Sequence, residues 1–368
     1  MTDLLDLIVL SFLPPSCWIR TAELLRGGAD PGSALLEVFA QPSRLSELRA
    51  RAQASVRRAA ERGIAPIRWG DASYPAALTT IVDPPPVLWS RSARAPVDVL
   101  NAPIVAIVGA RAASPYATSV AERIAGDLAH AGVVVASGMA RGVDAAAHRG
   151  ALAAGGATVA VAGSGVDVIY PPEHAQLARD IERSGALVSE LVPGTPPLPQ
   201  FFPLRNRIIS GLSRAVVVVE AGEKSGALIT ARSALEQGRE VLAVPGNVLS
   251  GRNRGGHGLL RDGAKIVESA DDILDELGMP GLVSGPAPGR RAGLREPAGG
   301  DSGAPGGPGD SAGHADPVVA CLTPGEPASL DTIAERTGLS PTRLLPRLFE
   351  LELQGVIARV GGGRFLRV

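Results

Sequence analysis

The chain has 368 residues, of which 36 are lysine or arginine and 37 are aspartate or glutamate, so its formal net charge is -1. The length predicts two or three domains, and the balanced charge excludes a protein coated in positive charge, so any contact with nucleic acid must come from a local group of arginines. Lysine occurs only at Lys224 and Lys265, and the abundance of alanine, glycine and proline indicates that the arginine excess reflects GC-rich coding.

The two cysteines, Cys17 and Cys321, lie in segments that we assign to different domains, without CxxC spacing or a nearby histidine pair. Neither a disulfide framework nor a metal site is expected, which favours a cytoplasmic protein. The apolar N-terminal run contains Asp3 and Asp6, so we interpret it as an amphipathic helix and not as a signal peptide. No stretch reaches the roughly 18 uncharged apolar residues of a membrane span.

Residues 1–70 predict a small helical domain, SAM-like or helix-hairpin-helix-like, because apolar residues recur with helical spacing between turns. The predicted helices are 4–12, 17–25, 34–39 and 46–62. Such a domain either binds DNA or only packs against the rest of the chain, and the pattern favours packing. The arginines of its last helix are more typical of a solvated face than of a binding patch; they are Arg49, Arg51, Arg57, Arg58 and Arg62.

Residues 71–278 predict an extended Rossmann-like domain. A short edge strand is expected near Trp89, after a proline run. Apolar strands are then predicted at 104–108, 133–136, 158–162, 186–189, 215–219, 240–244 and 265–267, alternating with helices at 116–131, 145–154, 173–183, 206–212, 227–237 and 270–277. Continuously apolar strands that alternate with helices are typical of a parallel sheet covered on both faces, which makes this an α/β fold.

Polar turns follow six of these strands, at 109–111, 137–144, 163–171, 189–190, 220–226 and 245–247, and all but 189–190 contain glycine. A single turn of this kind is weak evidence, because strand-to-helix turns need glycine in any case. In an open parallel sheet, however, the carboxyl ends of the strands share one edge, and ligands bind there. The six turns together therefore predict one ligand site.

The turns contain neither GxGxxG nor GxxxxGK[ST], which argues against a dinucleotide cofactor and a P-loop triphosphate site. Arg111, Arg141, Arg205 and Arg207 instead suggest phosphate binding, since arginine binds phosphate through two parallel hydrogen bonds. Phe201 and Phe202 lie just upstream of RNR, and exposed aromatic rings stack on unpaired bases. Each ring is equally compatible with core packing, and Asn206 with capping of the next helix.

Seven motifs follow one another along this domain: VGAR, SGMARGVDAAAH, YPPEH, SE, FPLRNRIISGLS, VVVVEAGEKSGALITARSALEQGREVLAVPG and LLRDGAKIV. In order and spacing this series, over roughly residues 74–267, resembles the DNA-processing protein A family, also called Smf or DprA. The resemblance implies an extended Rossmann-like domain that binds single-stranded DNA, dimerises, and passes the strand to a RecA-type recombinase in natural transformation. It implies no catalytic activity and no cofactor.

The motifs and the strand ends together give the candidate DNA- and phosphate-binding residues. They are Gly109, Arg111, Ser137, Gly138, Arg141, Gly142, Phe202, Arg205, Asn206, Arg207, Lys224, Ser225 and Gly226. Ala110 stands where the family has a serine or threonine, so one hydroxyl contact to phosphate is missing here. The chain also departs from the family pattern after PG, where it has Asn253, Gly255 and His257.

Several polar residues have structural explanations that we prefer. Asp144 is expected to complement the dipole of the helix that it begins, and His148 to be packed or hydrogen-bonded. Ser137 and Ser225 are not in a GxSxG motif, and hydroxyls beside glycine turns usually cap backbone groups. Lys224 is of more interest, since it keeps a compact charge at the ligand edge of a chain that otherwise uses arginine.

The sequence changes character near residue 279. Residues 279–315 are mainly glycine, proline, alanine and serine, which predicts a flexible linker. Residues 316–368 predict a winged helix, with a turn at Thr337, Gly338 and Leu339 and a terminal strand pair. Its recognition-type helix carries Arg343 and Arg347 but also Glu350 and Glu352, so a partner-binding role is as well supported as DNA binding.

Two classes of function compete. The first is a single-stranded DNA-binding protein that loads a RecA-type recombinase, and the second is a hydrolase of nucleotide phosphates on a Rossmann-like fold. The chain lacks a PGGxGT-type motif with a downstream glutamate, so only Glu190 and Glu220 could serve the enzyme. We therefore expect a binding protein and not an enzyme.

Overall fold

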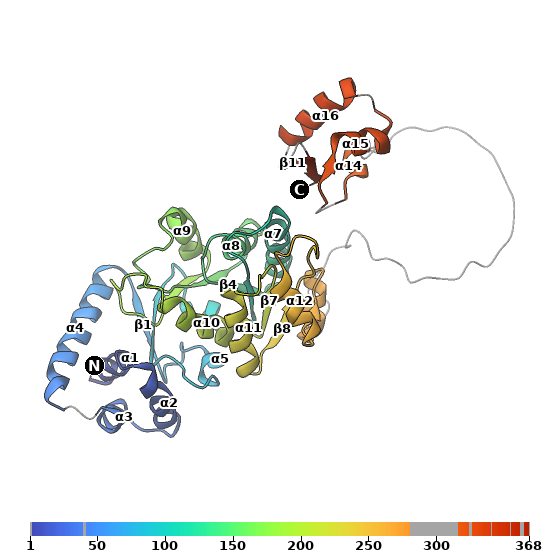
Figure 1. Cartoon of the computed structure of the whole chain (residues 1–368). Coiled ribbons are helices and arrows are strands. Elements are labelled where there is room, and N and C mark those ends of the chain that lie inside the picture. Colours follow the sequence, from blue (N-terminus) through green and yellow to red (C-terminus); the bar gives the residue numbers. More distant parts are fainter. Residues whose placement is uncertain are drawn as a thin grey trace. The chain divides into compact units, whose positions relative to one another are not determined.

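The computed structural model describes residues 2–39, 42–279, 316–323, 326–339, 341–353, 355–360 and 364–367 (Figure 1). The chain forms two compact units, Met1–Ser284 and Gly285–Val368. The predicted linker lies outside the described residues from residue 280 onward. No helix in the described ranges is long and apolar enough to cross a membrane.

The N-terminal segment folds into helices, as its apolar spacing predicts. They are α1 (Thr2–Ser11), α2 (Trp18–Arg26), α3 (Pro31–Val38) and α4 (Leu45–Glu61), with single 3-10 turns at Pro15–Cys17 and Pro42–Arg44. α3 begins at Pro31 because the carboxylate of Asp30 accepts a hydrogen bond from the backbone of Ser33. These helices share an apolar core with Val87, Trp89 and Val166 of the sheet domain. They belong to the same compact unit as the sheet, and a domain boundary at residue 70 stays a prediction.

The described residues form a nine-stranded sheet. Its strands are β1 (Ala65–Arg68), β2 (Val87–Arg91), β3 (Ile104–Val108), β4 (Val134–Ser137), β5 (Thr158–Val161), β6 (Ala186–Ser189), β7 (Ala215–Val218), β8 (Glu240–Ala243) and β9 (Lys265–Ile266), in the order β1-β2-β6-β5-β4-β3-β7-β8-β9. The strands from β3 to β9 run parallel, and each lies within one residue of its predicted bounds.

Two strands at one side differ from the prediction. β2 pairs antiparallel with β6, and β1 pairs antiparallel with β2, so the sheet is mixed and β2 is not its edge. β1 lies within residues 1–70, which the sequence pattern predicts as a helical domain. Its Pro66 has no backbone N–H, which an edge strand tolerates.

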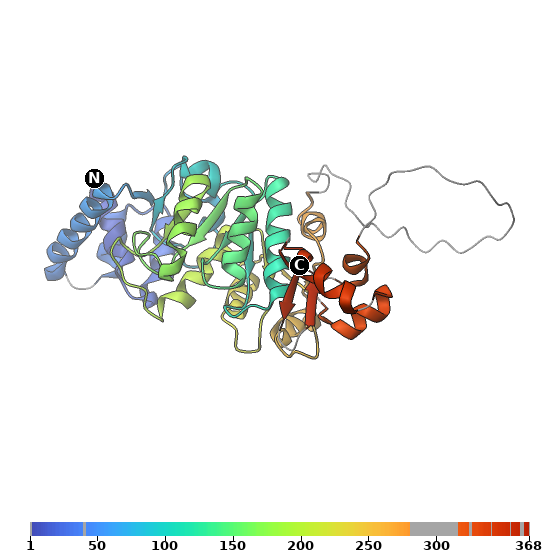
Figure 2. The same cartoon turned by 90° about the horizontal axis from the view of Figure 1, so that it is seen from above.

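Helices cover both faces of the sheet (Figures 1 and 2). One face packs against α7 (Pro115–His130), α8 (Val143–Ala153), α9 (Ala175–Ser184) and α13 (Ala270–Glu276), and the other against α5 (Ala76–Thr79), α6 (Pro96–Leu100), α10 (Phe201–Leu212) and α11 (Ala227–Glu236). Alternate residues of one strand serve the two faces: Val105 and Ile107 pack toward α7, and Ile104 and Ala106 toward α10. Two further helical elements, a 3-10 turn at Pro172–His174 and α12 (Arg254–Arg261), lie beyond β5 and β8.

The C-terminal unit is a winged helix, as predicted. It contains α14 (Pro317–Cys321), α15 (Leu330–Thr337), α16 (Pro341–Leu353) and a small antiparallel sheet of β10 (Ala328–Ser329), β12 (Arg364–Arg367) and β11 (Ile357–Val360), in that order. α15 ends at Gly338, whose φ of +68° is the left-handed conformation that glycine adopts without strain. Arg347 of α16 forms ion pairs with Asp316 and Glu350. The side chain of Arg343 lies outside the described residues.

Candidate functional site

A pocket of about 640 Å³ opens at the carboxyl ends of β4, β3 and β7, which are neighbours in the sheet. The candidate residues that line it are Gly109, Arg111, Phe202, Arg205, Asn206, Lys224, Ser225 and Gly226. They come from the turns after β3 and β7 and from α10. The structure therefore places a pocket at the sheet edge where the glycine-bearing turns predict a ligand site.

One wall of the pocket is a single face of α10. Phe202, Arg205, Asn206 and Ile209 line it, at the i, i+3, i+4 and i+7 positions of one helical stripe. The ring of Phe202 is half-buried because Gly163 makes room for it; a Cβ on Gly163 would come within 2.8 Å of the ring. The same ring also borders the pocket, so Phe202 both packs and faces the open space.

Two aromatic rings and a guanidinium group lie together at the pocket. The centroid of Phe202 is 5.5 Å from that of Tyr170, and the guanidinium carbon of Arg111 lies 5.4 Å from the Phe202 centroid. Tyr170 is 44% exposed, which leaves its ring free to meet a ligand. Tyr170 was not among the candidate residues, although an exposed aromatic in a strand-end turn is the signal that could have identified it.

Two exposed cations line the pocket without acidic partners. Arg111 follows β3, and Lys224 lies between β7 and α11. Neither forms an ion pair in the part of the chain that the structure describes. Because α11 begins three residues after Lys224, the positive end of its dipole lies beside these charges. The open part of the pocket thus attracts an anion.

Arg205 lies beneath these cations and is 5% exposed. Its Nη1 donates to the carbonyl oxygens of Gly138, at 2.7 Å, and Val161, which tie the ends of β4 and β5 to α10. Burial lowers the pKa of Arg205 to about 10; the charge of Asp144 opposes this shift, and that of Arg111 adds to it. Arg205 is therefore a buried scaffold charge at the pocket floor.

Glycines allow the strand-end turns to approach closely. A Cβ on Gly109 would lie 2.6 Å from Cγ2 of Val143, and one on Gly142 would collide with the carbonyl oxygen of Ala110. Gly142 also has a φ of +74°, which a side chain would strain. A Cβ on Gly138 would occupy the space that the guanidinium group of Arg205 fills. Gly138 and Gly142 thus shape the site without lining it.

Two further candidates lie outside the pocket. Ser137 is completely buried, and its hydroxyl donates to the carbonyl oxygen of Ile107 at 2.6 Å, which excludes it from ligand contact in this structure. Arg141 is exposed but forms an ion pair with Glu173. The carboxylate of Glu173 therefore partly neutralises the charge of Arg141.

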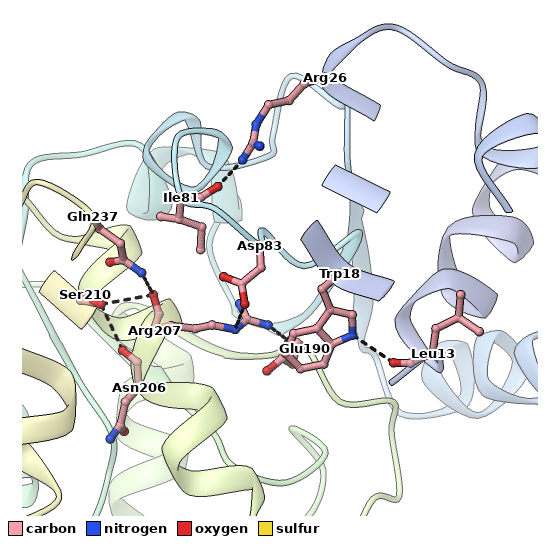
Figure 3. A network of polar contacts seen from close by, with 10 residues as sticks. All are labelled: Leu13, Trp18, Arg26, Ile81, Asp83, Glu190, Asn206, Arg207, Ser210 and Gln237. Carbon is pink, nitrogen blue, oxygen red and sulfur yellow. Dashed lines mark hydrogen bonds and ion pairs between the residues drawn. The ribbon is translucent and has the colours of Figure 1, made fainter. Parts of the chain in front are cut away.

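Arg207 does not line the pocket, in contrast to the hypothesis that RNR presents two phosphate contacts. Its side chain reaches toward Asp83, Glu190 and Trp18 (Figure 3). It forms ion pairs with Glu190 and with Asp83, whose carboxylate lies 3.2 Å from Nε. Its guanidinium carbon lies 4.7 Å from the ring centroid of Trp18 in α2. The reason is helical geometry: residues two apart lie about 200° apart around a helix, so Arg205 and Arg207 face opposite sides.

The carboxylates near the site have structural roles. Glu220 accepts hydrogen bonds from the backbone and hydroxyl of Ser114, at 3.0 and 2.6 Å, and Glu190 is held by Arg207. Asp144 accepts from the backbone of Gly138 and Ala140; burial raises its pKa, while Arg205 and these donors oppose the shift. It thus supports the turn before α8. The described residues contain no group of three or more potential metal ligands.

His148 is buried in the α8 core, as its structural interpretation expects. Its Nδ1 lies 2.7 Å from Oγ1 of Thr158, whose hydroxyl donates to the carbonyl oxygen of Val135. Because that hydroxyl proton is used, Nδ1 carries the hydrogen and donates. Burial, with smaller contributions from Arg205 and His174, lowers the pKa of His148 to about 3.

Stability is therefore expected to fall as the pH falls below about 6.5. In that range the unfolded chain protonates His148 while the folded chain does not, which costs about 1.4 kcal/mol per pH unit until the pH nears the folded pKa. Urea unfolding at pH 7.5 and pH 5 should show a smaller loss for His148→Gln than for the wild type. The exposed His130→Gln serves as the control. An identical pH slope in His148→Gln and wild type would show that His148 does not cause the loss.

Two asparagines hold segments near the site, and one of them, Asn206, differs from its sequence interpretation. Asn206 does not cap a helix, because α10 begins at Phe201; its Nδ2 lies 3.3 Å from the carbonyl oxygen of Gly226, across the pocket. Asn253 is buried and fixes the segment after β8: its Oδ1 accepts from the backbone of Ala221 at 2.9 Å, and its Nδ2 donates to Val244 at 3.0 Å. At this departure from the family pattern, Asn253 thus fixes the start of α12.

Two family models match this chain. Residues 65–278 match the model of the DNA recombination-mediator protein A family, and residues 303–363 match that of the DprA winged helix domain. The chain is 39% identical to Protein Smf of Escherichia coli over 293 residues, which cover 79% of this chain and 74% of that protein.

Similar solved structures include two DNA processing proteins. The first is DNA processing protein A from Streptococcus pneumoniae, with a TM-score of 0.64 and 34% identity, covering 73% of this chain and 95% of the other. The second is DNA processing protein A from Helicobacter pylori, which was described for its single-stranded DNA binding mode, with a TM-score of 0.52 and 28% identity, covering 58% and 95%.

Proposed function

The chain belongs to the DNA recombination-mediator protein A family, and we propose that it binds single-stranded DNA in the strand-end pocket. The observation that carries the proposal is that two exposed cations, Arg111 and Lys224, line one pocket without acidic partners among the described residues, with Arg111 lying over the ring of Phe202. Phosphates neutralise such cations, and unpaired bases stack on such a ring. The similar protein from Helicobacter pylori, known for its single-stranded DNA binding mode, supports this ligand.

Each pocket group then has a role. Arg111 and Lys224 bind phosphates, and the rings of Phe202 and Tyr170 stack on bases. The turn from Lys224 to Gly226 places the positive N-terminal end of α11 beside the bound DNA. Arg205 fixes the floor. Gly109, Gly138 and Gly142 lack a Cβ and so allow the strand-end turns and Arg205 to pack closely. Arg207 does not line the pocket; it contacts Asp83, Glu190 and Trp18 on the other side of α10.

The binding assignment also favours a protein without catalytic turnover. Glu190 and Glu220, which a hydrolase would need, are engaged by Arg207 and Ser114. Transfer of the bound strand to a RecA-type recombinase, a homodimer and a cytoplasmic location are further parts of the proposal, which rest on the family. Arg347 of the winged helix is paired with two acids, which favours a protein partner for that unit.

Fluorescence anisotropy of a labelled oligothymidine, single-stranded and as a duplex with oligoadenine, tests the proposal. Wild-type protein should prefer the single strand and lose affinity as salt rises. Arg111→Ala and Lys224→Ala should each weaken binding about tenfold and reduce the salt slope by about 0.7, the value for one phosphate contact on a single strand.

The control is Arg123→Ala, an exposed arginine of α7 on the opposite face of the sheet. It should bind like the wild type. Equal affinity of all four proteins would remove Arg111 and Lys224 from the site. Absence of binding by the wild type would refute the proposed ligand.

A further inference from the structure

A second hollow, of about 380 Å³, lies beside the N-terminal helices. One wall is a stripe of α4, formed by Arg51, Ala54, Ser55 and Arg58 at the i, i+3, i+4 and i+7 positions, together with Phe12. The other wall is the loop after β6, residues 192–196. We call this hollow the α4 groove. The sequence pattern favours a solvated face for these arginines.

The charge of the α4 groove is unopposed. Its lining contains Arg51 and Arg58 and no acidic side chain. Within the described residues neither arginine forms an ion pair, whereas Arg49 of the same helix pairs with Asp6, and Arg62, just after the helix, pairs with Asp167. A third hollow, between α8 and α9, shows the contrast: its two arginines are accompanied by Glu173 and Asp180.

The two arginines are positioned by the groove itself. The guanidinium carbon of Arg51 lies 5.1 Å from the centroid of the Phe12 ring, which orients this side chain along the wall. The guanidinium group of Arg58 packs against Gly194, where a Cβ would collide with it. Gly194 has a φ of +88°, so the loop presents bare backbone at this point. Both cations are therefore held in place and still exposed to solvent.

The loop wall is tied to α4 and to the loop after β5. Asp167 accepts a hydrogen bond from the backbone of Gly194 at 2.7 Å and pairs with Arg62. The backbone of Gly165 donates to Thr195 at 3.0 Å. The shape of the α4 groove is thus set by contacts that leave Arg51 and Arg58 free.

The α4 groove continues the edge that carries the strand-end pocket. Pro196 lines the groove and Pro199 lines the pocket. Three residues of chain span at most about 11 Å, so the two rims are close. The loops between them follow β5 and β6, the next strands along the sheet after β4, and end at the same carboxyl edge.

We propose that a single strand of DNA leaving the strand-end pocket runs over the loop after β6 into the α4 groove, where Arg51 and Arg58 bind its phosphates. This inference rests on the proposed function and extends it to the N-terminal helices, so the DNA site comprises two parts in series. A short oligonucleotide fills the pocket alone, and a longer one reaches both parts.

The test is the dependence of affinity on oligonucleotide length. Full-length protein is titrated against labelled oligothymidines from about 4 to about 16 nucleotides, the range of single-strand site sizes, at several salt concentrations. Wild-type affinity should rise with length and then level off. The double variant Arg51→Ala, Arg58→Ala should match the wild type on the shortest oligomer that binds, and lose tenfold or more on the longest, with its salt slope reduced by about 1.4 for two phosphate contacts.

Arg57→Ala is the matched control, since Arg57 is an exposed arginine of α4 outside the groove lining. It should behave as the wild type at every length. Unchanged affinity of the double variant on all oligomers, or an equal loss on short and long ones, would overturn the inference. Arg111→Ala separates the two proposals, because it should weaken binding at all lengths; absence of wild-type binding to any oligomer would refute the proposed function, and this inference with it.

Discussion

Replacing Arg205 with alanine is expected to lower the free energy of unfolding by about 3–5 kcal/mol, the cost of removing one partner from a buried charge pair. Arg205 donates to the carbonyl oxygens of Gly138 and Val161. Its positive charge also offsets part of the rise in the pKa of Asp144 that burial causes. Its loss leaves two buried acceptors without this donor and a buried carboxylate without its cation. Urea unfolding followed by circular dichroism measures the change.

Asp144→Asn provides the control for this interpretation. In the Arg205→Ala background it removes the uncompensated charge, so the double variant should lose less stability than the sum of the two single changes. DNA binding by folded Arg205→Ala protein should keep the wild-type salt slope, since the guanidinium group serves the floor of the pocket. A stable variant with a reduced slope would instead make Arg205 a phosphate contact.

Most of the sheet domain could be predicted from the sequence, because buried parallel strands are continuously apolar and helices between them have clear apolar stripes. β1 could not, since a four-residue edge strand containing Pro66 has too short a pattern. α12 has the sequence RGGHGLLR, whose glycines disfavour a helix. It forms because Asn253 ties its start to Ala221 and Val244, residues that are distant in the sequence.

The position of the site was also predictable, since the carboxyl edge of a parallel sheet depends only on strand order. The roles of individual residues were less so. The pattern predicts a helix from residue 206, whereas α10 begins at Phe201, with Pro203 in its first turn, where proline is tolerated. With the helix starting at Phe201, the spacing alone separates Arg205 from Arg207. On the other side of α10, Arg207 contacts Trp18 and Asp83. These residues are distant in the sequence, so no local pattern predicts the contacts.

Arg207→Ala is expected to destabilise the fold by about 3–5 kcal/mol as well. Arg207 is the cation between Glu190 and Asp83, and its stacking on Trp18 joins α10 to the N-terminal helices. Burial raises the pKa of both carboxyl groups, and Arg207 opposes that shift. Without the arginine their pKa values rise further. An acid with a raised folded pKa stabilises the fold at low pH and loses this contribution as the pH rises, so the deficit should be larger at pH 8 than at pH 5.5.

Two variants make this expectation specific. Glu190→Gln in the Arg207→Ala background removes one of the unpaired charges and should recover part of the stability at pH 8, but little at pH 5.5. Arg214→Ala, an exposed arginine just after the same helix, should be nearly neutral. Because Arg207 does not line the pocket, folded Arg207→Ala protein should keep the wild-type salt slope for oligothymidine. A slope reduced by about 0.7 with unchanged stability would return Arg207 to the DNA contacts and refute its role as the link between α10 and α2.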